Sequence, residues 1–247
     1  MAIEVTFVGC GDAFGSGGRF NTCFHVANGE TRFLIDCGAT SMVALKALGL
    51  DPNAIGTILI THFHGDHFGG LPFFLLDARF VSKRSSPLTI VGPRGTGAAL
   101  KQSMESAFHG SSSTDFKFSL EIIELVPGQA RTVDGLDVTP QQVVHGPQGG
   151  PYLAYRIGVG GKVIAYTGDT EWTEPLIEAG READLLIAEA YYRDRQVRYH
   201  LDLATLERHL PAMRPRRIIL THLSSEMLER VDEVAYDIAS DGLTISL

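Results

Sequence analysis

Three imidazoles and one carboxylate lie within six consecutive residues, as His62, His64, Asp66 and His67. Neutral imidazole nitrogens and carboxylate oxygens are the ligands that zinc takes in proteins, at roughly 2.0–2.2 Å. Manganese and iron accept the same donors and are the alternative ions. Four donors from one short loop are too many for a single tetrahedral site. The spacing therefore predicts two metal ions that share the loop.

Three further donors occur later in the chain, His145, Asp169 and His222. Each comes just after an apolar segment with the composition of a buried strand. Open α/β sheets place their sites at the carboxyl ends of strands. These residues therefore complete a predicted set of seven donors for two divalent ions.

Strand-like and helix-like segments alternate along the chain, which predicts an α/β fold with two sheets covered by helices. No composition break or long linker divides the sequence, so we expect one domain over residues 1–247. Strands are expected at 5–8, 22–26, 32–35, 57–60, 88–91, 116–124, 131–133, 137–144, 152–157, 163–166, 185–188, 217–220 and 243–245, and helices at 40–48, 71–80, 97–108, 175–179, 203–210 and 226–231.

The donor spacing matches a known signature. Residues 62–67 read HxHxDH, the motif of the metallo-β-lactamase superfamily, and the sequence resembles that superfamily over nearly its whole length. The resemblance implies the αββα sandwich, two mixed sheets flanked by helices. It also implies that Asp36 supports the metal loop without binding metal. By the superfamily's assignment, one ion is held by His62, His64 and His145, the other by Asp66, His67 and His222, and Asp169 bridges the two.

The closer similarity is to the phosphodiesterase branch, which contains ribonuclease Z and the small cyclic-phosphate phosphodiesterases. Ribonuclease Z binds tRNA through a long glycine-rich and basic arm, whereas only 23 residues separate His145 from Asp169 here. We therefore expect a small or cyclic phosphodiester, or a short nucleic-acid end, as substrate. The similarity rests on HFGGLP at 67–72, PLTIVGP at 87–93, GDT at 168–170 and LTH at 220–222.

Three alternative functions remain open at this point. One is a ribonuclease Z-type RNA endonuclease. Another is a lactonase or thioesterase that uses the same metal centre on a carbonyl carbon. The third is a metal-binding sensor or scaffold without turnover, which a full set of metal donors disfavours.

The resemblance also implies a mechanism, in which a hydroxide bridging the two ions attacks phosphorus. Asp66 would orient that nucleophile or accept its proton while also binding metal. His200 resembles the catalytic histidine of both phosphodiesterase groups, and it stands just before a helix that Asp202 can cap. We expect His200 to protonate the leaving alkoxide as a general acid. The alternative is an ordinary polar residue at a helix start.

The overall charge argues against a large polyanionic partner. The chain carries 21 basic and 29 acidic side chains, a formal net charge of −8, whereas nucleic-acid binding usually leaves a basic footprint. RNA is therefore the less favoured partner. No apolar run approaches the ~18 residues of a membrane span, and no targeting segment is visible. These features predict a cytoplasmic protein without a membrane partner.

Residues 71–80 carry more apolar side chains than one core-facing helix stripe uses, among them Phe73, Phe74, Leu76 and Phe80. The related phosphodiesterases commonly pair through this region. We therefore expect a homodimer. The alternative is complete burial of these side chains inside the monomer.

Overall fold

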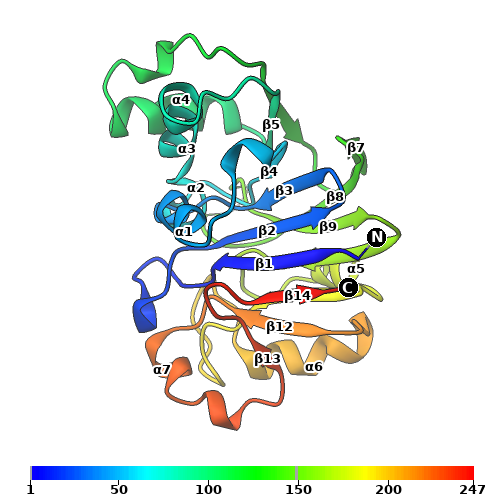
Figure 1. Ribbon diagram of the computed structural model, residues 1–247. Coiled ribbons are helices and arrows are strands. Elements are labelled where there is room, and N and C mark those ends of the chain that lie inside the picture. The colour runs from blue at the N-terminus through cyan, green and yellow to red at the C-terminus, as the bar shows by residue number, and fades with distance from the viewer. Residues whose placement is uncertain (1, 148–149) are drawn as a thin grey trace.

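The computed structural model describes residues 2–147 and 150–247 and arranges the strands in two seven-stranded sheets (Figure 1). The first sheet has the spatial order β14 (Thr244–Ser246), β1 (Glu4–Gly9), β2 (Cys23–Asn28), β3 (Thr31–Ile35), β4 (Thr57–Leu59), β5 (Leu88–Pro93) and β6 (Leu120–Leu125). The second has the order β13 (Asp237–Ile238), β12 (Ile218–Thr221), β11 (Leu185–Glu189), β10 (Lys162–Tyr166), β9 (Leu153–Val159), β8 (Leu136–Gln142) and β7 (Arg131–Val133).

Both sheets are mixed and repeat one pattern of pairing. In the first sheet, neighbours from β14 to β3 are antiparallel and neighbours from β3 to β6 are parallel. In the second sheet, β7 to β10 are antiparallel and β10 to β13 are parallel. Parallel strands need a crossover connection, and here most of the crossovers contain helices.

Helices cover the outer face of each sheet, so the expected αββα sandwich is confirmed. One apolar core lies between the sheets, a second lies between the first sheet and its helices, and a third lies between the second sheet and its helices. Within the described residues, no helix combines the length and apolar content that crossing a bilayer requires. The helices are α1 (Ser41–Ala47), α2 (Gly65–Phe68), α3 (Leu71–Phe80), α4 (Thr96–Ala107), α5 (Pro175–Gly180), α6 (Leu203–Met213) and α7 (Ser225–Leu228).

The central strands are apolar at consecutive positions because both of their faces are covered. Side chains alternate between the two faces of a strand. Phe33 and Ile35 of β3 face the core between the sheets, and Leu34 faces the core beneath the helices. Such runs therefore identify buried strands even without alternating polarity.

Four segments differ from the sequence-based expectation. Residues 65–68, expected to belong to a loop, form the single turn of α2. The strand expected at 116–124 begins only at Leu120, because Phe116 and Phe118 pack against each other and onto the helical core. The helix expected at 226–231 is the single turn of α7 followed by a short 3₁₀ turn, Val231–Glu233. Strand β13 was not predicted, since it pairs only two residues with β12 and is too short to show a period.

The metal loop is pressed against the segment that follows β3. The N–H of Cys37 donates to the carbonyl of His67 at 2.7 Å, and the N–H of Gly70 donates to the carbonyl of Cys37 at 2.8 Å. A Cβ on Gly38 would lie 2.1 Å from the carbonyl oxygen of Asp66, so only glycine allows this approach. On sequence grounds Gly65 favours a tight turn, but a Cβ there would meet nothing within 4 Å.

We therefore expect Gly38→Ala to destabilise the protein by about 1–3 kcal/mol, as overpacking does, and to displace the metal loop. Gly65→Ala is the matched control on the same loop, and it should leave stability unchanged or raise it slightly, because alanine is the better helix residue. Chemical denaturation followed by circular dichroism measures both. Equal stability of the two variants would contradict the tight approach at Gly38.

Candidate metal centre

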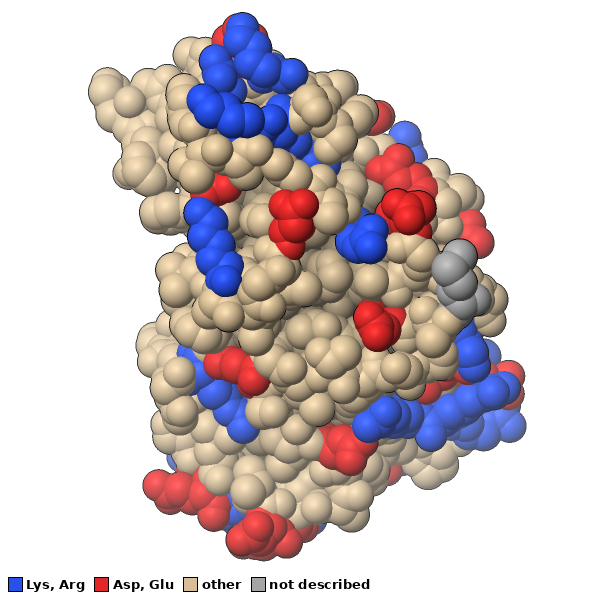
Figure 2. Space-filling model, in the orientation of Figure 1, with Lys and Arg blue, Asp and Glu red and all other residues tan. Residues whose placement is uncertain are grey.

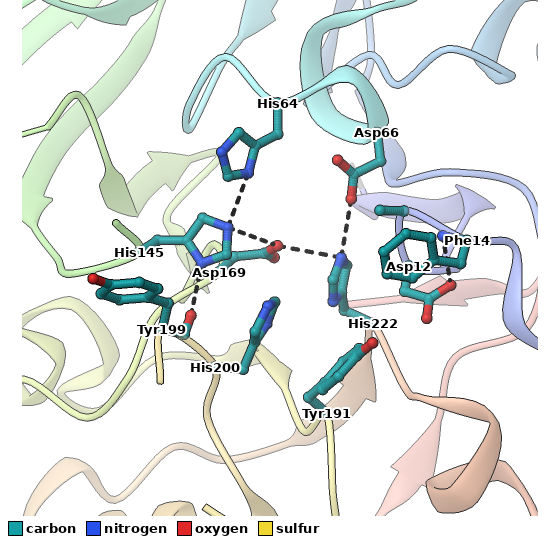
Figure 3. A pocket seen from close by; sticks show the side chains of 11 residues that line it. Asp12, Phe14, His64, Asp66, His145, Asp169, Tyr191, Tyr199, His200 and His222 are labelled. Atoms are coloured by element: carbon teal, nitrogen blue, oxygen red, sulfur yellow. Dashed lines mark hydrogen bonds and ion pairs between the residues drawn. The ribbon is translucent and has the colours of Figure 1, made fainter. Parts of the chain in front are cut away.

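The structure brings the seven predicted donors together at the ends of strands from both sheets. The loop with His62–His67 follows β4 and crosses into α2, His145 follows β8, Asp169 follows β10, and His222 follows β12. Two groups of side chains result, and in each group the donor atoms lie within 4.8 Å of one another. Figure 3 shows donors of both groups around one pocket.

The first group consists of His62, His64 and His145. Nε2 of His145 lies 3.0 Å from Nδ1 of His64. His62 stands edge-on to both rings, with ring centroids 4.6 and 4.8 Å away. Three imidazole nitrogens that face one point are a donor set suited to zinc.

The second group consists of Asp66, His67, Asp169 and His222. Oδ2 of Asp169 lies 3.2 Å from Nε2 of His67 and 3.2 Å from Nε2 of His222. The same oxygen is 3.6 Å from Nε2 of His145, which belongs to the first group. Asp169 therefore lies between the two groups, where a bridging carboxylate has to be.

Several buried atoms of these groups lack hydrogen-bond partners among the described residues, namely Nε2 of His62, Nε2 of His67 and Oδ1 of Asp169. A buried polar atom left in this state costs about 1–3 kcal/mol. All three belong to side chains whose lone pairs can bind a cation. The residues present therefore fit divalent metal ions, and the unpaired atoms are the observation that supports this.

Outer contacts fix the orientation of the rings. Nδ1 of His67 donates to Oδ2 of Asp36 at 2.7 Å, and Asp36 also accepts from the N–H of Thr61 at 2.8 Å. Nδ1 of His145 donates to the carbonyl of Tyr199 at 2.6 Å. Such contacts set which ring nitrogen is left free for a metal. Asp36 thus takes the supporting position that the sequence resemblance implied.

Three residues around the site have left-handed backbones although none is glycine. Their φ angles are 59° at Asp36, 71° at Tyr199 and 56° at His222. A non-glycine residue in this region is uncommon, and such residues concentrate at functional sites. At His222 the conformation is held by its N–H, which donates to the carbonyl of Cys10 at 3.1 Å.

Buried carboxylates give the second group a strong attraction for positive charge. Burial opposes charge on His222, but Asp169, the hydrogen bond to Asp66 and the nearby Glu189 carboxylate outweigh it and raise the pKa of His222 to about 10. Burial opposes charge on His67 as well, and the surrounding carboxylates raise its pKa well above the usual value. In the first group, burial lowers the pKa of His62 and of His64, so their nitrogens are neutral and free to bind a cation.

His200 is held beside the donor groups by Glu189, which ends β11. Nδ1 of His200 donates to Oε1 of Glu189, a carboxylate with no exposed surface. Burial favours the neutral imidazole, but the Glu189 carboxylate outweighs it and raises the pKa of His200. The ring therefore keeps a proton to higher pH than a free histidine does. Its Nε2 is the atom left for a ligand in the pocket.

Asp169, Glu189, His200 and His222 form a further group with metal-binding side chains. Glu189 is already satisfied, because it accepts from His200 and from the N–H groups of Thr170 and Leu201 at 2.9 and 3.1 Å. The unpaired nitrogens of His62 and His67 belong only to the two groups above, so those groups are the better candidates for metal.

A cavity of about 250 Å³ opens over the donors. Several features of this cavity were not predicted from the sequence. The carbonyl of Tyr199 and the left-handed backbones carry no local sequence signal. Phe14 and Tyr191 also line the cavity, and the only sequence hint for Phe14 is the glycine-rich segment in which it lies.

Comparison with known proteins agrees with this architecture. The family model of the anti-Pycsar protein Apyc1 matches residues 3–238. Ribonuclease Z of Pyrococcus abyssi is 30% identical over 248 residues, which cover 80% of this chain and 78% of the relative.

Two solved structures have the same fold over nearly the whole chain. The short form of human tRNase Z (ELAC1) has a TM-score of 0.79 at 26% identity, covering 98% of each chain. The metallo-β-lactamase fold protein YhfI of Bacillus subtilis has a TM-score of 0.79 at 21% identity, covering 100% of each chain. With the donor geometry above, these similarities show that the chain belongs to the Apyc1 family of the metallo-β-lactamase superfamily and is a metal-dependent hydrolase of its ribonuclease Z-like, phosphodiesterase branch.

Proposed function

We propose that the chain is a phosphodiesterase that uses two divalent ions, with zinc the expected metal, to hydrolyse small or cyclic phosphodiesters or short nucleic-acid ends. The observation that carries the proposal is the pair of donor groups around one pocket, with Asp169 between them and His200 at the wall. Donors from both sheets build this pocket, which supports a single hydrolase domain over residues 1–247.

In this proposal His62, His64 and His145 hold one ion, and Asp66, His67 and His222 hold the other, with Asp169 shared. When bound, such ions lower the pKa of a water and neutralise charge on a phosphate. Manganese or iron are the alternative ions.

Side chains of the protein orient the attacking water and transfer the protons. Asp66 Oδ2, 3.2 Å from His222 Nε2, can orient the attacking water or accept its proton. His200 donates its Nε2 proton to the departing oxygen, while Glu189 on Nδ1 stabilises the charged ring.

A small substrate is favoured over structured RNA by the short chain length beside the site and by the charge on one face of the molecule. Between His145 and Asp169, most of the chain forms the antiparallel pair β9 and β10, which leaves no length for an RNA-binding arm. On the face in Figure 2, basic side chains stand in separate groups among acidic ones. A continuous basic track for an RNA backbone is therefore not presented on that face.

The second candidate is a ribonuclease Z-type RNA endonuclease, favoured by relatives that carry the name ribonuclease Z. A lactonase or thioesterase would use the same metals. Turnover of diesters, monoesters, lactones, thioesters, β-lactams and precursor tRNA by protein of defined metal content separates these functions. We expect the highest kcat/KM for a small diester. A higher value for tRNA, a lactone or a thioester would replace the proposal.

Protein purified without chelator should contain close to two divalent ions per chain, because seven donors are too many for one zinc. Asp169→Ala should lose metal and activity together, by more than the ~10–100-fold typical of changes to outer contacts of a metal site. Asp232→Ala is the control. It removes an exposed carboxylate that is not one of the seven donors, and the variant should keep its metal and its activity. Elemental analysis provides the measurement. One ion per fully active chain would contradict the two-metal proposal.

His200→Ala should slow a 2′,3′-cyclic nucleotide by ~10²–10⁴-fold, the usual contribution of a general acid. Bis(p-nitrophenyl) phosphate should be affected much less, because p-nitrophenolate leaves without a proton. Metal content should stay unchanged, and His109→Ala, which replaces a fully exposed histidine, should behave as wild type. Equal losses on both substrates would mean that His200 positions the substrate instead.

A homodimer formed through α3 is also proposed. Phe74 is fully buried and belongs to the core, but Phe73 is 45% exposed and Phe80 is 56% exposed. With Val81 and Phe108, these two rings line an apolar groove beside α1. An exposed apolar groove of this kind is typical of association surfaces.

Light scattering at micromolar concentration should therefore give twice the mass of one chain. Replacing Phe73 and Phe80 together by Ser should give the mass of a single chain, because the apolar surface that drives association is lost. Val126→Ser is the control, since Val126 is 53% exposed but lies outside the groove. A single-chain mass for the wild type would contradict the proposal.

A further inference from the structure

Phe14 stands apart from the other exposed aromatic side chains. It is 86% exposed, the highest value of any large apolar side chain described, and it lines the cavity over the metal donors. Phe73, Phe80 and Phe108 gather in the groove beside α1 instead. A single exposed apolar residue needs no explanation on an open surface. Beside the metal donors that line the same cavity, it offers a ligand a flat apolar face.

The backbone around Phe14 is held by a buried carboxylate. Asp12 is 1% exposed, and its Oδ1 accepts from the N–H of Phe14 at 3.2 Å and from the N–H of Ser16 at 2.9 Å. Its Oδ2 accepts from the hydroxyl of Ser16 at 2.7 Å. Gly15 supplies a left-handed residue, with φ at 67°, that lets the chain turn directly after Phe14. The position of the Phe14 backbone is therefore fixed by the loop itself.

The loop is also tied to the second sheet. The hydroxyls of Ser16 and Ser225 lie 3.1 Å apart, which joins the loop to α7. A Cβ on Gly17 would lie 2.8 Å from Cδ1 of Leu228, so the loop packs closely on that helix. The backbone of this loop is therefore ordered before a ligand contacts the ring, which lowers the entropy cost of binding.

The cavity combines a polar end with this apolar face. Figure 3 places Phe14 on the side of Asp66 and His222, across the pocket from His145 and Tyr199. Tyr191 packs its ring on His200, with centroids 4.5 Å apart, and burial raises its pKa to about 12, so its hydroxyl stays a neutral donor. An ester whose phosphate reaches the donors can extend its organic group toward Phe14.

We propose that Phe14 stacks on the nucleobase of a nucleotide substrate and is a specificity-determining residue of the site. The proposal rests on the phosphodiesterase function given above. Every base has a π-face, and stacking on an aromatic side chain is tolerant of base identity. Phe14 therefore selects nucleotides over diesters that lack a ring, without strong preference among the bases.

The test compares 2′,3′-cyclic AMP with glycerol cyclic phosphate, which keeps the cyclic diester but has no base. Phe14→Ala should raise KM for the nucleotide on the order of 10-fold, in line with the loss of one stacked base. Its kcat should change little, because the contact is the same in the ground and transition states. KM for glycerol cyclic phosphate should not change. Phe14→Tyr should behave as wild type, and Val126→Ala is the control for loss of an exposed apolar side chain.

Binding provides a readout that does not depend on turnover. Calorimetry should show that Phe14→Ala weakens the binding of AMP but not of ribose 5-phosphate. Equal effects on both ligands, no effect on either, or full retention of AMP affinity by Phe14→Leu would overturn the stacking proposal. A wild-type protein that hydrolyses no diester of the screen described above would overturn the proposed phosphodiesterase function, and the AMP comparison would still decide the role of Phe14.

Discussion

Four acidic side chains, Asp36, Asp66, Asp169 and Glu189, are buried close together, and the rest of the structure depends on balancing their charge. A carboxylate in a protein interior is strongly disfavoured unless it is paired, hydrogen-bonded or bound to a metal. Here each one contacts at least one imidazole. The contacts are Asp36 with His67, Asp66 with His67 and His222, Asp169 with His67, His145 and His222, and Glu189 with His200 and His222.

This balance is possible only because the two sheets meet. Asp36 and the loop with His67 follow strands of the first sheet, whereas Asp169, Glu189 and His222 stand at the ends of strands of the second. The core between the sheets fixes their distance, and side chains cross it near the site. The hydroxyl of Tyr155 donates to the carbonyl of Ile60, just before the metal loop. Packing of the apolar core thus sets the geometry of the charged cluster.

Different elements of the fold contribute different parts of the pocket. Strand ends hold the metal donors, the Glu189–His200 pair stands at one wall, and the loop with Phe14 reaches the mouth. The metal donors and the pair are rigidly held by buried contacts, as chemistry requires. Phe14 itself lies at the surface, whereas the start of its loop accepts the N–H of His222 at the carbonyl of Cys10 and is therefore tied to the cluster.

Much of this architecture follows from the sequence by itself. The spacing of His62, His64, Asp66 and His67 indicates metal binding, because few other patterns place four such donors in one loop. Buried strands and the longer helices follow from local runs and periods, so most of their positions were predicted within a few residues. The later donors could be found because each follows an apolar strand.

Other features were decided by tertiary structure alone. The sequence does not reveal that the carbonyl of Tyr199 orients His145, because that contact joins residues 54 positions apart through a left-handed backbone. Nor does it reveal that Phe14 lies over the metal donors, since its loop is placed by contacts with Asp12 and α7. Local patterns report which face of an element is apolar. They do not report which distant segments meet, because that depends on how the two sheets pack and on which buried polar groups must find partners.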